Sequence, residues 1–256
     1  MTLSETDGGL GSYGQDLEVA VFGATGGIGA AFVAALASDP AVARVHALSR
    51  QPPPALPGKA VWQACDLTEE WSVEAAAREV GSATGALQLV LVAVGVLQDE
   101  KLGVSPEKTW RHLDPQAMAE VYRINTVAPA LAAKHFLPLL DRDRRAAFAA
   151  LSARVGSIED NRYGGWHSYR ASKAALNQLL RTFAIELARR NPTAFCVGLH
   201  PGTVDTGLSK PFQRNVPDGQ LFSPDFSAAK LLAVLDGLKD GDSGGLFAWD
   251  GARIPY

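Results

Sequence analysis

The stretch Leu17–Gly29, LEVAVFGATGGIG, decides the fold. Its first six residues, Leu17–Phe22, are apolar except for Glu18 and partly β-branched, which predicts a short buried strand. Gly23 ends this strand, and the alanine-rich, apolar-spaced segment Ile28–Ala37 predicts a helix. The chain therefore opens with a strand, a glycine-rich turn and a helix.

The same alternation continues along the chain. Further strands are predicted over 42–48, 60–65, 87–94, 145–152, 194–200 and 245–249. Further helices are predicted over 72–80, 115–140, 168–190 and 227–238, the second with an interruption near Pro129. The strand over 87–94 is almost continuously apolar, as in strands that are covered on both faces. This order predicts an α/β fold with a doubly wound, Rossmann-type parallel sheet of about seven strands and helices on both faces.

Composition excludes several classes of protein. The 256 residues carry 24 Lys and Arg and 27 Asp and Glu, so the net charge of −3 offers no basic field for nucleic acid. No apolar run approaches the roughly 20 residues of a membrane span. We expect residues 1–16, with four glycines, to form a flexible leader and residues 17–256 to form one domain. Cys65 and Cys196 lie in apolar runs and indicate free thiols in a reducing cytoplasm.

The turn after the first strand has the spacing of a dinucleotide-binding loop. Gly23, Gly27 and Gly29 form the pattern G-x-x-x-G-x-G. The first glycine permits a tight turn, and the later two let a phosphate approach the backbone and let the helix pack on the strand. Free N–H groups at the helix N-terminus would then bind a pyrophosphate. A glycine trio alone is weak evidence, but its place between strand and helix favours nucleotide binding over a merely flexible loop.

Residues after the second and third strands bear on the choice of dinucleotide. Ser49 and Arg50 stand where an acidic residue would bond the ribose 2′-hydroxyl of NAD. The guanidinium of Arg50 suits the 2′-phosphate of NADP instead, although a solvated surface arginine would have the same sequence. Asp66 could accept a hydrogen bond from the adenine amino group or could serve as a turn carboxylate. We expect NADP rather than NAD.

Tyr169 and Lys173 are four residues apart, on one face of a predicted helix. A free tyrosine has a pKa near 10, and a neighbouring ammonium group is expected to lower it. A phenol tuned in this way could exchange a proton with a carbonyl oxygen. The spacing alone is common on solvated helices, so it needs support from other motifs.

That support comes from a resemblance to the short-chain dehydrogenase/reductase family over about 17–256. The motifs that carry it follow the family's order: the glycine turn, Asp66, Asn125, Tyr169 with Lys173, and Pro201–Thr206. The stretches 155–169 and 250–256 resemble the C-factor-like and carbonyl-reductase subgroup.

The resemblance implies roles for these residues. Tyr169 would be the general acid in reduction, Lys173 would hold the nicotinamide ribose, and Asn125 would support a proton-relay water. Gly95 would shape the cofactor cleft, although 92–94 is Val-Ala-Val where the family often has side-chain amides. The expected cofactor-binding residues are Gly23, Thr25, Gly27, Ile28, Gly29, Ser49, Arg50, Asp66, Leu67, Gly95, Lys173, Pro201, Gly202, Val204 and Thr206.

One position departs from the family's pattern. The family's serine usually stands three residues before a glycine, and counting back from Gly156 gives Ala153. The neighbouring hydroxyls are Ser152 and Ser157. Adjacent strand residues face opposite ways, so Ser152 needs a local twist to take this role, and its other interpretation is a strand residue bonded to backbone. Ser152 is our candidate for the fourth catalytic residue.

Two functions of different classes remain. The first is an NADP-dependent oxidoreductase acting on a small carbonyl or alcohol substrate, with a lid-like loop over 207–225 and no metal site. The second is an NAD(P)-binding regulatory or signalling protein with little turnover, motivated by Ala153 and the missing amides. The resemblance also implies a homodimer or homotetramer that associates through the helices over 115–140 and 168–190. The sequence does not identify the substrate.

Overall fold

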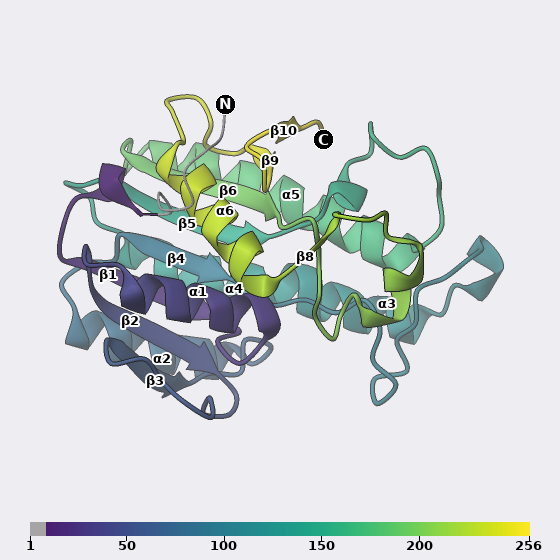
Figure 1. Ribbon diagram of the computed structural model, residues 1–256, viewed down its shortest axis with the longest axis horizontal. Helices are drawn as coiled ribbons and strands as arrows, with labels where there is room; N and C mark the ends of the chain where they lie inside the picture. The colour runs from purple at the N-terminus through teal and green to yellow at the C-terminus, as the bar shows by residue number, and fades with distance from the viewer. Residues whose placement is uncertain (1–8) are drawn as a thin grey trace.

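The computed structural model describes residues 9–256, and its centre is an eight-stranded sheet (Figure 1). The sheet has the order β10-β9-β6-β5-β4-β1-β2-β3, and β10 alone runs antiparallel to its neighbour. Its strands are β1 Leu17–Phe22, β2 Val42–Ser49, β3 Ala60–Ala64, β4 Leu89–Val92, β5 Ala146–Leu151, β6 Ala194–His200, β9 Leu246–Ala248 and β10 Arg253–Ile254. The predicted doubly wound parallel sheet is confirmed. The eighth strand has only two residues, too few for a periodic signal.

The winding of the chain places a crevice at the centre of the sheet. From β1 the chain proceeds through β2 and β3 to one edge, then returns to β4 and proceeds through β5 and β6 toward the other. β1 and β4 are neighbours, with Phe22 paired to Val92. Open α/β sheets bind ligands outside the carboxyl ends of the strands at such a switch point.

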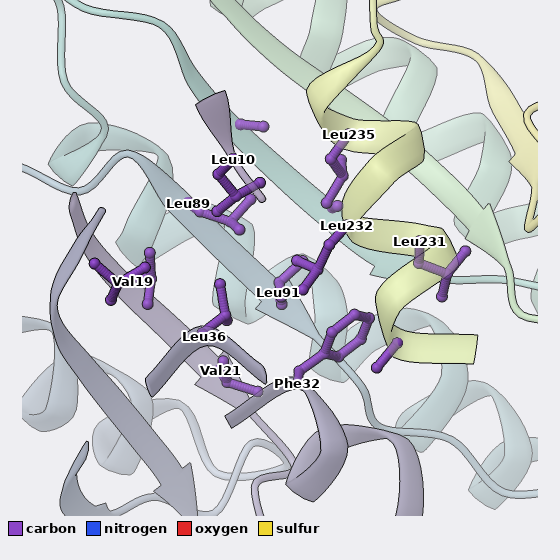
Figure 2. Close-up of a cluster of buried hydrophobic side chains, with 14 of the residues drawn as sticks. Leu10, Val19, Val21, Phe32, Leu36, Leu89, Leu91, Leu231, Leu232 and Leu235 are labelled. Carbon is purple, nitrogen blue, oxygen red and sulfur yellow. The ribbon is translucent and has the colours of Figure 1, made fainter. Parts of the chain in front are cut away.

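Helices cover both faces of the sheet (Figure 1). One face carries α1 Gly27–Ser38 and α6 Pro224–Asp236, and the other carries α2 Glu70–Ala83, α4 Ala128–Phe136 and α5 His167–Ala188. Alternate residues of β1 enter the two cores. Val19 and Val21 belong to the same buried cluster as the leucines of α6 (Figure 2), whereas Phe22 meets Phe136 of α4 with ring centroids 4.8 Å apart. Burial of both faces explains why the strands read as nearly continuous apolar runs.

The helical region predicted over 115–140 is divided differently from our expectation. It consists of α3 Pro115–Tyr122, a π-helical turn at Arg123–Val127, α4, and a short 3-10 turn at Leu137–Leu139. Pro129 lies in the first turn of α4, where a missing N–H is tolerated. The irregularity therefore precedes Pro129, and π-helical turns of this kind are frequent at functional sites.

The expected leader over 1–16 is only partly within the described residues. Residues 1–8 lie outside them. Leu10 and Tyr13 are buried, and Ser12 N donates to Asp236 Oδ1 at 2.7 Å. Residues 10–13 are thus packed against the end of α6.

The lid-like loop predicted over 207–225 contains short regular elements. β7 Thr203–Val204 pairs with β8 Leu221–Phe222, and a 3-10 helix spans Lys210–Asn215 between them. In Figure 1 this green segment lies beyond the carboxyl ends of the strands. We call residues 205–220 the lid segment. Among residues 9–256, no helix is long and apolar enough to cross a bilayer.

Candidate functional site

A cavity of about 510 Å³ lies at the switch point of the sheet. Ten of the predicted site residues line it: Gly27, Ile28, Gly95, Ser152, Tyr169, Lys173, Pro201, Gly202, Val204 and Thr206. Asn125 is buried beside it, because Gly95 lies against both Asn125 Oδ1 and Lys173 Nζ. The remaining predicted residues do not line this cavity: Gly23, Thr25, Gly29, Ser49, Arg50, Asp66 and Leu67. The structure therefore brings the predicted catalytic residues and about half of the cofactor set together.

The glycine turn forms a cradle that side chains would fill. Gly23 has φ +78°, and a Cβ there would lie 2.6 Å from Ala93 O. A Cβ at Gly29 would lie 2.0 Å from Gly23 O, and one at Gly27 would lie 2.7 Å from Thr206 Cγ2. No side-chain hydrogen bond caps the N-terminus of α1. This geometry fits a dinucleotide, because the bare backbone and uncapped N–H groups suit a pyrophosphate.

The residues after β2 and β3 are arranged for two different tasks. Ser49 Oγ donates to Gln51 O at 2.7 Å and accepts from Trp62 Nε1 at 3.1 Å, so its hydroxyl is already engaged. Arg50 is exposed and forms no salt bridge with another residue of the described chain. The guanidinium of Arg50 is therefore available to a phosphate.

Asp66 organises the turn before α2. Its Oδ1 accepts from Thr68 N at 3.0 Å and from Thr68 Oγ1 at 2.7 Å. Partial burial acts to raise the pKa of Asp66, but the bonds from Thr68 and the charges of Arg50 and Arg123 outweigh it and hold the pKa below its usual value. Asp66 therefore acts as a turn carboxylate, one of the two alternatives above, while its second oxygen has no partner among the described residues.

Tyr169 and Lys173 lie on the same face of α5, at the end of β5. Lys173 Nζ donates to Leu151 O at 2.8 Å and lies 5.9 Å from the centroid of the Tyr169 ring. Both side chains are buried. A backbone carbonyl therefore fixes the ammonium group beside the phenol.

The pKa values of this pair differ from the expected ones. Burial raises the pKa of Tyr169 to about 12 and lowers the pKa of Lys173 to about 8. The expectation that Lys173 lowers the pKa of Tyr169 is wrong for the protein alone, because loss of water disfavours the charged form of both groups. At neutral pH the phenol is protonated.

Asn125 is held rigidly in the π-helical turn. Its Oδ1 accepts from Val96 N at 2.8 Å, and its Nδ2 donates to Val96 O at 2.8 Å and to Ser172 Oγ at 3.1 Å. Thr126 Oγ1 also donates to Ser172 O at 2.8 Å. These bonds join the turn, the chain after β4 and α5, and they fix the cleft around Gly95.

The hydroxyl groups near Ala153 face other partners. Ser152 Oγ donates to Asn177 Oδ1 at 2.6 Å, and Ser157 Oγ accepts from Asp160 N at 3.0 Å. Ala153 instead packs with Leu97 and Tyr169. A methyl group thus stands beside Tyr169 at the position where the family's pattern has a serine, and the geometry gives Ser152 no donor bond toward the phenol.

The sequence indicates Trp166 as either a pocket or a packing aromatic, but it does not reveal that Trp166 forms an aromatic wall of the cavity with Phe212. The Trp166 ring lies 6.3 Å from the Tyr169 ring and 5.2 Å from the Phe212 ring, centroid to centroid. Phe212 belongs to the lid segment, about 45 residues further along the chain, so no local pattern links the two. Gly164 and Gly165 before Trp166 signalled a turn but not its direction.

Two histidines differ in their relation to the cavity. His200 lines the cavity at the switch point. Burial, and to a smaller extent the charge of Arg154, lowers the pKa of His200 to about 4, although the charge of Asp250 acts in the opposite direction. His167 lines a separate cavity of about 440 Å³ behind α5. In the described part of the chain, no three His, Cys, Asp or Glu residues are grouped to hold a metal ion.

Known proteins resemble this chain in sequence and in architecture. A family model described as short chain dehydrogenase matches residues 18–217. C-signal of Myxococcus xanthus is 35% identical over 145 residues, which cover 56% of this chain and 81% of that protein. The 1-hydroxy-2-glutathionyl-2-methyl-3-butene dehydrogenase of Rhodococcus sp. (strain AD45) is 31% identical over 191 residues, 75% of this chain and 78% of that protein.

A solved structure extends the likeness to nearly the whole fold. The NADPH-bound carbonyl reductase from chicken fatty liver is 30% identical and superposes with a TM-score of 0.79, covering 94% of this chain and all of that one. With the matching family model and the nucleotide cradle at the switch point, this likeness assigns the chain to the short-chain dehydrogenase family, as an NAD(P)H-dependent oxidoreductase.

Proposed function

We propose that this protein is an NADP-dependent oxidoreductase that interconverts a carbonyl compound and its alcohol, with Tyr169 as the general acid in reduction. The observation that carries the proposal is the position of Tyr169 and Lys173. Both line the cavity that Gly27 and Ile28 of the glycine turn also line. A proton donor and a dinucleotide cradle thus share one crevice.

The residues of the cleft divide the task. When bound, the dinucleotide supplies the hydride for the carbonyl carbon. The protonated Tyr169 phenol donates its proton to the carbonyl oxygen. Lys173, oriented by Leu151 O, binds the ribose and stabilises the phenolate that forms. Asn125 keeps the cleft around Gly95 open and supports a relay water.

Arg50, which lies outside the cavity, supports NADP over NAD, and the other predicted cofactor residues suit the parts that the two dinucleotides share. The exposed Arg50 would hold the 2′-phosphate, and Asp66 and Leu67 would border the adenine. Thr25 and the cradle would contact the pyrophosphate, and Val204 with Thr206 would face the carboxamide. The carbonyl reductase from chicken is NADPH-bound, and a dehydrogenase/reductase structure from Burkholderia multivorans, whose likeness concerns the fold alone, holds NADP.

The test compares wild type with Tyr169→Phe in NADPH oxidation against a panel of reactive carbonyl compounds. We expect the variant to bind NADPH, as measured by nicotinamide fluorescence. Its turnover number should fall by a factor of at least about 10². Equal rates of NADPH oxidation in both proteins would overturn the proposal. Tight NADPH binding by wild type without turnover of any compound would favour the regulatory alternative. The relatives that are named as a dehydrogenase and a carbonyl reductase do not favour that alternative.

We propose that the protein forms a homodimer or homotetramer in the cytoplasm. Val127, directly before α4, and Ile185 on α5 are large apolar side chains that are about half exposed. They support a homodimer or homotetramer through these helices, which light scattering on the purified protein tests. Cys65 and Cys196 are buried and unpaired, as expected for a cytoplasmic protein.

A further inference from the structure

Trp166 has a backbone conformation that is rare for a large side chain. Gly164, Gly165 and Trp166 have φ values of +63°, +67° and +50° in succession. Glycines adopt this left-handed region freely, but a tryptophan there is strained. Strained residues persist only where the surrounding structure holds them, and they cluster at functional sites.

Glu107 holds Trp166 in this conformation. Trp166 N donates to the backbone oxygen of Glu107 at 2.6 Å. Glu107 is only 6% exposed. Its carboxylate accepts hydrogen bonds from Ser168 N at 3.2 Å and from Ser168 Oγ. Glu107, about 60 positions earlier in the chain, thus binds Trp166, the residue before α5. It also caps the first turn of α5, the helix that carries Tyr169.

The result is an apolar wall beside the reacting phenol. Trp166 packs edge-on to Tyr169, at 79° between the rings, and contacts Phe212 of the lid segment. Ala153, Val155 and Leu97 complete this cluster. Arg154 also lines the cavity, but its guanidinium pairs with Asp160 at 3.0 Å. Among the described lining residues the other cation is Lys173, whose ammonium group is held by Leu151 O and is assigned above to the cofactor ribose. The apolar wall itself therefore offers no cation to an anionic substituent.

We propose that Trp166 is a specificity-determining residue that selects uncharged carbonyl compounds with an aromatic or bulky apolar group next to the carbonyl. Glu107 is the positioning residue that keeps the indole in place. The inference rests on the proposed function, and it goes further by naming the substrate class and the residues that choose it.

Two diketones test the role of Trp166. Phenylpropanedione and butanedione share the reacting dicarbonyl group, and a phenyl ring in the first replaces a methyl group in the second. Without the indole, Trp166→Ala should raise KM for phenylpropanedione about tenfold more than it raises KM for butanedione. Trp71→Ala, at a far exposed site on α2, is the matched control and should change neither substrate.

A second measurement does not depend on turnover. Titration with phenylpropanedione should quench the tryptophan fluorescence of wild type and of Trp71→Phe, with the same diketone concentration at half-maximal quenching. In Trp166→Phe this saturable quenching should be absent. Trp166→Gly checks the backbone argument, because a glycine relieves the left-handed strain. Its denaturation midpoint should be no lower than that of Trp166→Ala. Equal KM changes for both diketones, or quenching that persists in Trp166→Phe, would overturn the proposal.

Glu107 variants separate positioning from plain stability. Glu107→Ala should reproduce the selective rise in KM for phenylpropanedione, and Glu107→Gln, which keeps an acceptor for Ser168, should restore much of it. If Glu107→Ala lowers the denaturation midpoint and leaves the ratio of the two KM values unchanged, its positioning role is refuted. Loss of NADPH oxidation in Tyr169→Phe together with insensitivity to Trp166→Ala would refute this inference and leave the proposed function standing. Equal activity of Tyr169→Phe and wild type would refute the proposed function itself.

Discussion

Ser152 Oγ donates a hydrogen bond of 2.6 Å to Oδ1 of Asn177, and both side chains are buried. Asn177 lies on α5, one turn beyond Lys173. The hydroxyl that follows β5 thus fastens the strand to the helix. Next to the phenol stands the methyl group of Ala153. In the proposed reaction, Tyr169 therefore donates to the reacting oxygen without a serine hydroxyl beside it.

Ala153→Ser should raise carbonyl reduction. A second donor to the developing oxyanion is typically worth about 10²–10³ in rate, so a gain toward that size is expected in kcat with NADPH and a reactive diketone. An unchanged or lower kcat in a folded Ala153→Ser protein would show that the site does not use a donor at this position.

Ser152→Ala is the companion to that variant. It should lower stability rather than turnover, because Asn177 Oδ1 loses its partner. An unsatisfied buried acceptor costs about 1–3 kcal/mol, measurable by urea unfolding. A loss of kcat comparable to that of Tyr169→Phe would instead make Ser152 a catalytic residue.

Local pattern was sufficient for most of the sheet. The strand predicted over Leu17–Phe22 is β1 residue for residue, because burial of both faces favours a nearly continuous apolar run, which Glu18 alone interrupts. The cradle was also predictable, since only glycine fits where Cβ would meet backbone oxygen at Gly23 and Gly29. Such features depend on neighbours within a few residues.

The missed features depend on residues that are distant in sequence. The direction of Ser152 is set by Asn177, 25 residues away, and the conformation of Trp166 is set by Glu107. The π-helical turn at Arg123–Val127 was hidden because helical periodicity continues across it. The pKa of Tyr169 was misjudged because spacing reveals the nearby charge of Lys173 but not the depth of burial.

Gly29→Ala should disrupt both the fold and nucleotide binding. Its Cβ would lie 2.0 Å from Gly23 O, a clash with backbone that no side-chain rotation relieves. We expect a loss of about 1–3 kcal/mol in the free energy of unfolding and a weakened NADPH fluorescence titration. Gly85→Ala is the matched control, because a Cβ there meets no atom within 4 Å. Wild-type NADPH affinity in Gly29→Ala would show that the turn does not contact the dinucleotide.

Arg50→Glu should reverse the preference between the two dinucleotides. The variant replaces a free guanidinium with a carboxylate that repels the 2′-phosphate of NADPH and can accept from the 2′-hydroxyl of NADH. The ratio of the Kd values for NADPH and NADH should rise by at least about tenfold, and Arg78→Glu on α2 should leave it unchanged. A constant ratio would remove Arg50 from the cofactor site.

Lys173 should make stability depend on pH in the alkaline range. Its pKa is about 8 in the folded protein against 10.5 as the ordinary value, so between these values the unfolded chain binds the proton that the folded chain has lost. The burial cost of the ammonium group is complete below pH 8 and disappears as pH rises toward 10.5. The free energy of unfolding of wild type relative to Lys173→Met should therefore increase with pH, by at most about 1.4 kcal/mol per pH unit.

The measurement is urea unfolding of both proteins without dinucleotide from pH 7 to pH 9.5. This range stays below the point at which Tyr169, whose pKa is raised to about 12 from 10.0, begins to act in the opposite direction. Between pH 10 and pH 12 the folded state retains the Tyr169 proton that the unfolded state has lost, so the free energy of unfolding falls as pH increases. Lys239→Met provides the control, because that lysine is exposed and loses little water on folding. A difference between wild type and Lys173→Met that stays flat across the range would mean that Lys173 keeps its proton in the folded cleft.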